Sequence, residues 1–106
     1  MRIFTVTTIH IDLNADKWQV EPVSRSRCVG WFGDIESARR VILTNSADIY
    51  EQGYYNHAVI EELDEGLYPH PVSETWFCWR DEGYKQIEKP PHLIGPPATY
   101  VNFGIG

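Results

Sequence analysis

The run RIFTVTTIHID at residues 2–12 constrains the fold of this chain more than any other segment. It is rich in β-branched residues, which favour strands, and side chains in a strand alternate between its two faces. The odd-numbered and the even-numbered positions both include apolar side chains, so neither face is typical of a solvent-exposed surface. We therefore predict a central strand of a β-sheet over these residues.

A helix is predicted directly after the sequence GWFG. Asp34 follows Gly33 and is a typical N-cap, because its carboxylate can accept backbone N–H groups of the first helical turn. The stretch IESARRVILTN has helical spacing and Asn45 can end it, so we place the helix at about residues 34–45. A short turn or second helical piece follows at 46–53. The expected apolar face carries Ile35, Ala38, Val41 and Ile42, and the polar face carries Glu36, Arg39 and Arg40.

Further strands are predicted on both sides of this helix. The segment RSRCVGWFG at 25–33 precedes it, with a weaker candidate at 17–23 because Pro22 cannot donate to a ladder. A strand at 56–63 follows, and the sequence WFCWRDEGYKQI indicates a hairpin with its turn at 81–83. The proline-rich segment 90–97 is expected to be irregular, and residues 99–106 to form a last strand.

This order of elements predicts one α+β domain over residues 1–106. We expect a mostly antiparallel sheet of five to six strands with one main helix packed on one face. Alternation sends Trp76 and Cys78 to one side of the hairpin and Phe77 and Trp79 to the other, so one set lies off the helix-covered face. That set is covered by the segment 90–97, covered by a second subunit, or exposed as a contact site.

The charge of the chain narrows the classes of partner. It has 15 acidic residues against 9 basic ones and a net charge of −6. Such a balance opposes direct nucleic-acid binding, where Lys and Arg contacts to phosphate dominate affinity, and it suits either a basic partner or plain solubility. No segment resembles a signal peptide or a membrane span. Cys28 and Cys78 lie in apolar stretches, which indicates a cytoplasmic protein with reduced thiols.

Sequence motifs of common enzymes are missing. The chain contains no P-loop, no G-x-G-x-x-G, no H-E-x-x-H, no C-x-x-C and no G-x-S-x-G. The histidines and cysteines show no paired spacing of the kind that zinc sites use. We therefore expect no metal, no cofactor and no enzymatic activity. A less favoured alternative is a small enzyme using His57, which lies beside two tyrosines and titrates near neutrality.

The candidate contact surface is acidic and aromatic. Acidic residues cluster before the strand at 56–63, near its end and directly after it, and they suit Lys or Arg side chains on a partner protein. Exposed tryptophans are common anchors of protein interfaces. The predicted partner surface comprises Asp48, Glu51, Glu61, Glu62, Asp64, Glu65, Trp76 and Trp79.

An alternative site would bind a nucleotide signal and sequester it. Arginine can bind phosphate through paired hydrogen bonds, and aromatic rings can stack on a base. This alternative site comprises Arg25, Arg27, Trp31, Tyr54, Tyr55 and His57.

Several motifs along the chain are distinctive in wording: FTVTTIH, GWF before the helix, AVIEE followed by EG and YP, WFCW in the hairpin, and a final FGIG. In this order they resemble a family of small uncharacterised proteins of bacteriophages, prophages and their mainly Firmicute hosts. The resemblance covers most of the chain except the longer region RDEGYKQIEKPPHLIGPPAT, and it carries no catalytic residues.

The resemblance implies a genomic setting in which small accessory proteins often bind and block a host factor. We therefore expect a small non-enzymatic interaction protein that inhibits a host defence protein with a basic surface. Self-association into a homo-oligomer is an alternative use of the aromatic residues.

Overall fold

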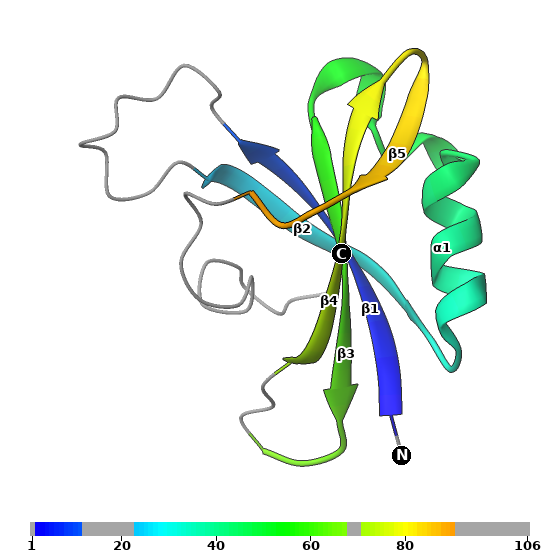
Figure 1. The fold of residues 1–106 in the computed structure, drawn as a ribbon, viewed down its shortest axis with the longest axis vertical. Coiled ribbons are helices and arrows are strands. Elements are labelled where there is room, and N and C mark those ends of the chain that lie inside the picture. Colours follow the sequence, from blue (N-terminus) through cyan, green and yellow to red (C-terminus); the bar gives the residue numbers. More distant parts are fainter. Residues whose placement is uncertain (1, 12–22, 68–70, 91–106) are drawn as a thin grey trace.

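The computed structural model describes residues 2–11, 23–67 and 71–90. The elements, in chain order, are β1 (Arg2–Ile11), β2 (Val23–Phe32), α1 (Ile35–Leu43), the 3₁₀ turns η1 (Ser46–Asp48) and η2 (Glu51–Gly53), β3 (His57–Asp64), β4 (Pro71–Arg80) and β5 (Gly83–Ile87). The five strands form one antiparallel sheet in the order β2-β1-β3-β4-β5, and α1 packs on one face of it (Figure 1). The predicted α+β class is confirmed.

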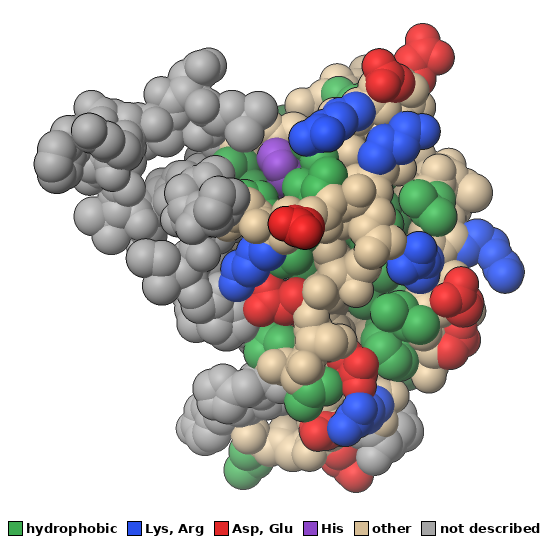
Figure 2. All heavy atoms as spheres, in the orientation of Figure 1, with side chains coloured by type: hydrophobic (Ala, Val, Ile, Leu, Met, Phe, Trp, Pro, Cys, Tyr) green, Lys and Arg blue, Asp and Glu red, His purple; other side chains and the backbone are tan. Residues whose placement is uncertain are grey.

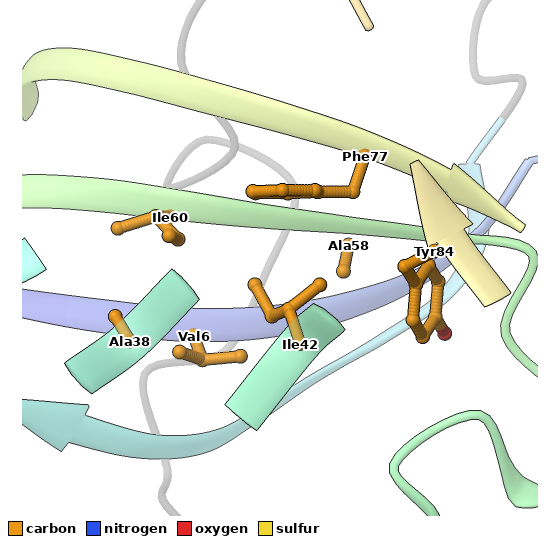
Figure 3. Close-up of a cluster of buried hydrophobic side chains, with 7 residues drawn as sticks. All are labelled: Val6, Ala38, Ile42, Ala58, Ile60, Phe77 and Tyr84. Atoms are coloured by element: carbon orange, nitrogen blue, oxygen red, sulfur yellow. The ribbon is translucent and has the colours of Figure 1, made fainter. Parts of the chain in front are cut away.

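The side of the sheet that faces α1 carries the main apolar cluster. Ala38 and Ile42 are the buried helix residues, and they meet Val6 of β1 and Ile60 of β3. Figure 3 shows these side chains converging between the helix and the strands. The cluster is completed by Ala58, Phe77 and Tyr84, and α1 contacts β1, β2, β3 and β5.

The opposite side of the sheet is buried as well. Ile9, Ile11, Val59 and Trp76 form a second apolar cluster there, and the neighbouring Thr7 is also buried. β1 lies between β2 and β3, so it is central in the sheet and buried on both faces, as its sequence predicted. Burial of both faces explains why this strand has no polar face.

The predicted boundaries need modest corrections. The helix begins after Asp34, whose carboxylate accepts the Ser37 N–H at 2.8 Å, but it ends at Leu43 rather than at residue 45. Asn45 has φ 49°, in the left-handed region, which stops the helix from continuing. β4 begins at Pro71, which is earlier than the hairpin pattern indicated. The strand predicted at 99–106 lies outside the described residues. So does the strand predicted at 17–23, except for Val23, which begins β2, and so does the irregular segment 90–97, except for Pro90.

A β-bulge in β2 determines which side chains share a face. Val6 pairs with Gly30 and Thr7 pairs with Cys28, so Val29 is an extra residue in the ladder. As a result Cys28 and Trp31 lie on the same side, opposite α1, although they are three residues apart. None of the described helices is long and apolar enough to cross a membrane.

Candidate partner-binding surface

The structure divides the predicted acidic surface between two ends of the molecule. Asp48 and Glu51 belong to the 3₁₀ turns that precede β3, whereas Asp64 ends β3 and Glu65 follows it. β3 has eight residues, and a strand of that length spans roughly 24 Å. Figure 2 shows acidic side chains at both ends of the long axis. One partner patch cannot include all of the predicted residues unless the patch is as long as the sheet.

Two members of the predicted surface are buried, and this corrects their assignment as contact residues. Glu61 is 0% exposed and Trp76 is 2% exposed. Both lie on the sheet face opposite α1, because Glu61 alternates with Glu62 along β3 and Trp76 pairs with Val59. The sequence interpretation placed Glu61 on an exposed contact surface. Burial of the second sheet face removes it from solvent.

Trp79 belongs to an aromatic cluster on the helix side of the sheet. Its ring stacks on Tyr50, with centroids 3.6 Å apart and planes 4° apart, and Tyr84 meets it edge-on at 5.1 Å. Tyr50 lies between the two 3₁₀ turns, so this stacking attaches the loop after α1 to the β4–β5 hairpin. Trp79 is partly buried and its main contacts are internal.

The acidic residues at the end of β3 are held by hydrogen bonds. Arg2 donates from Nε to Asp64 Oδ1 at 2.7 Å and forms a second ion pair with Glu62. Ser73 donates to the other oxygen of Glu62 at 3.1 Å. These hydrogen bonds raise the pKa of the Arg2 guanidinium above its usual range, with the bond to Asp64 as the largest cause.

Exposed apolar side chains lie at the same end of the molecule. Leu67 is 91% exposed in the β3–β4 connection, and Val72 is 50% exposed at the start of β4. Together with the acids that end β3 they form what we call the β3–β4 surface, made of Glu62, Asp64, Glu65, Leu67 and Val72. Sequence reasoning found its acids and missed its apolar residues, although the leucine directly after Glu65 and Gly66 was a visible signal.

The alternative nucleotide site is not assembled by the fold. Arg27 pairs with Thr8 and lies on the helix side of the sheet, where its guanidinium is 3.7 Å from Glu51. Trp31 pairs with Thr5 on the opposite side and is 52% exposed. The bulge at Val29 does not bring them together. The Arg25 backbone pairs with His10, and its side chain lies outside the described part.

The tyrosines and the histidine of that alternative lie at the entrance to β3. Tyr55 is buried and meets the exposed Tyr54 edge-on at 4.8 Å. His57 is buried, and its Nδ1 lies 2.8 Å from Asn56 Oδ1, which also accepts the Ile11 N–H at 2.9 Å. Because that oxygen is an acceptor, Nδ1 of His57 carries the hydrogen. This arrangement joins the ends of β1 and β3.

Two shallow hollows are present on the described surface. One has a volume of about 460 Å³ and is lined by β4 residues 71–76 and by residues 86–89. The other, of about 340 Å³, lies on the outer side of α1 beside Arg39, Arg40 and Leu43. His57 lines neither hollow. Within the described ranges, no group of three His, Cys, Asp or Glu side chains is placed to hold a metal ion.

Comparison with other proteins identifies neither a family nor a relative. The chain has no significant match among protein-family models, curated proteins or solved structures.

Proposed function

We propose that this protein is a small non-enzymatic binding protein that contacts a basic patch of a partner protein through its β3–β4 surface. The observation that carries the proposal is the exposure of Leu67 and Val72 beside carboxylates that are held in fixed positions. Covering exposed apolar side chains lowers the free energy of the complex, because apolar surface is removed from water. The surrounding acids steer a basic partner and add specificity.

The resemblance to small phage and prophage proteins supports a narrower version of this proposal. In that setting the partner is a host protein, and binding blocks it. The net charge of −6 fits a partner whose own surface is basic. A nucleotide-binding function has less support, because Arg27 and Trp31 lie on opposite sides of β2.

The test is an affinity capture from bacterial lysate at low and high salt, followed by mass spectrometry. The test variant combines Glu65→Lys with Leu67→Ser, and a matched control combines Asp48→Lys with Leu43→Ser. All four side chains are exposed, and each variant replaces one acid by lysine and one exposed leucine by serine, with Leu67 91% exposed and Leu43 49% exposed. We expect the wild type and the control to retain one bacterial protein at low salt, and the test variant to lose it. Equal retention by both variants would contradict this surface assignment.

A further inference from the structure

Strand β4 extends beyond its outer neighbour. β4 has ten residues and β5 has five, and the β5 residues pair with β4 residues 76–80. Within the described part of the chain, no strand pairs with residues 71–75 on the side away from β3. The hollow of about 460 Å³ lies at this place, where the next strand of the sheet would run. Unpaired strand edges of this kind are templates for pairing with another chain.

The hydrogen-bond pattern shows which backbone groups face the hollow. The Trp79 N–H donates to the Asn56 carbonyl of β3 at 2.9 Å. In an antiparallel ladder successive residues direct their N–H and C=O groups to opposite sides. Glu74, Trp76 and Cys78 therefore direct theirs away from β3. Trp76 and Cys78 pair with β5, and the N–H and C=O of Glu74 point towards the hollow.

The side chains around the hollow differ between its two sides. On the face opposite α1 lie Trp76 and Ile87, which are apolar, beside Glu74. The Glu74 carboxylate is fixed there, since it accepts Trp76 Nε1–H at 3.0 Å and lies 3.2 Å from Lys89 Nζ. On the face towards α1 lie Ser73 and Thr75, and Ser73 donates to Glu62 of the β3–β4 surface.

We infer that this hollow binds an extended segment of the partner as an added strand beside β4. Apolar side chains of the segment would pack on Ile87, which is partly buried and lies against the already buried Trp76, and its basic side chains would face Ser73, Thr75 and Glu62. The ligand class is therefore a strand that alternates basic and apolar residues. Main-chain hydrogen bonds supply affinity in this mode of recognition, and the alternating side chains supply specificity. The inference rests on the proposed function, because it describes how the partner reaches the same end of the molecule.

The first experiment uses a defined peptide, acetyl-(Lys-Val)₄-amide. Two controls contain the same four Lys and four Val residues: acetyl-Lys₄-Val₄-amide, and the alternating peptide with every second backbone amide N-methylated. Calorimetry measures affinity, and amide hydrogen exchange by NMR measures protection. We expect the alternating peptide to bind at least tenfold more tightly than either control. We also expect bound peptide to slow exchange at the Glu74 amide, with little change at Ser73 and Thr75, whose amides face β3.

A pair of variants tests the location. Thr75→Lys adds a like charge where the basic side chains would lie, and Gln52→Lys adds the same charge in the exposed η2 turn. We expect peptide binding to weaken at least tenfold in Thr75→Lys and to stay unchanged in Gln52→Lys, with both variants folded by circular dichroism. If Thr75→Lys does not fold, the N-methylated peptide and the Glu74 exchange rate decide the question.

The outcomes separate this inference from the proposed function. Equal binding of the alternating and N-methylated peptides, or no binding at millimolar concentration, would overturn strand addition. The proposed function would still stand if the Glu65→Lys, Leu67→Ser variant lost its captured protein. Protection at Glu74 together with discrimination against N-methylation would establish the added strand even before the partner is known.

Discussion

At the residue scale, Tyr84 contacts three separate parts of the fold, which its position in the sequence did not indicate. It belongs to the short edge strand β5 and is 1% exposed. Its hydroxyl donates to the Tyr55 carbonyl at 2.7 Å, and its ring meets Tyr50 and Trp79 edge-on. One side chain therefore joins the hairpin, the loop after α1 and the entrance to β3.

Removing the hydroxyl of Tyr84 should destabilise the protein without disturbing the aromatic cluster. Tyr84→Phe leaves the ring contacts in place and leaves the buried Tyr55 carbonyl without its donor. We expect the free energy of unfolding in urea to fall by about 1 to 2 kcal/mol, with little change in near-ultraviolet circular dichroism. Tyr84→Leu also loses the ring contacts and should cost more. A Tyr84→Phe variant as stable as the wild type would contradict a contribution from this hydrogen bond.

Tyr84 also predicts a loss of stability at alkaline pH. Burial raises the pKa of its phenol far above the usual value, so the folded state keeps the proton at pH values where the unfolded chain releases it. Its stabilising contribution is complete below pH ~10 and falls as pH rises further, by at most about 1.4 kcal/mol per pH unit. Comparing urea unfolding at pH 8 and pH 11 should show a smaller alkaline loss in Tyr84→Phe than in the wild type. Identical losses would show that this phenol is not the cause.

At the scale of elements, the segment between α1 and β3 is defined by its backbone angles. Left-handed φ values occur at Asn45, Ala47, Asp48, Glu51 and Gln52, so neither 3₁₀ turn can extend into a helix. The segment is fixed by the Asn45 side chain, which accepts the Tyr50 N–H at 3.0 Å, and by the stacking of Tyr50 on Trp79. Tertiary contacts thus compensate for unfavourable local conformations.

Replacing alanine by glycine should have opposite effects on stability at two positions in these neighbouring elements. Ala47 is exposed with φ 55°, where glycine avoids a steric cost of roughly 1–2 kcal/mol that is partly offset by the entropy glycine loses on folding. We expect Ala47→Gly to leave stability unchanged or raise it by up to about 1 kcal/mol. Ala38 is buried inside α1, so Ala38→Gly should cost about 1 to 2 kcal/mol. Chemical denaturation of both variants measures the contrast, and equal destabilisation would contradict it.

Elements with local signals were the ones that the sequence predicted well. The Asp34 cap, the alternation in β1 and the turn at Asp81 and Glu82 are each determined by a few adjacent residues. The start of β4 was missed, because Pro71 and the mostly polar residues 72–75 lack a strand pattern and are held by pairing with β3. The burial of Glu61 depends on the cover of the second sheet face, which no local pattern records.

The candidate site shows the same limit. Its acids are adjacent in sequence and were found, whereas Asp48 and Glu51 were grouped with them although β3 separates the two sets by its whole length. The hollow beside β4 results from unequal lengths of β4 and β5, which is a property of strand pairing. The distance between the two sets of acidic residues and the hollow beside β4 can be derived only when the pairing register of the strands is known.

At the scale of the whole molecule, the strand order determines the chemistry of the two cysteines. Cys28 lies in β2 and Cys78 in β4, and both are buried and reduced. β1 and β3 lie between these strands, so three interstrand spacings separate the cysteines, roughly 14 Å in all. A disulfide requires Cα atoms within about 7 Å. The sheet itself therefore prevents an intramolecular disulfide.

We expect both thiols to stay reduced in the native protein under mild oxidation, and to react slowly with a thiol reagent. Burial raises the pKa of the Cys28 thiol, which further lowers its thiolate fraction near neutral pH. Intact mass after treatment with diamide checks the first expectation, and the rate of reaction with Ellman's reagent checks the second. In urea both thiols should react rapidly, because unfolding removes the burial. A native protein that lost two hydrogens by mass while remaining monomeric would contradict the strand order, since only a rearranged sheet brings these cysteines together.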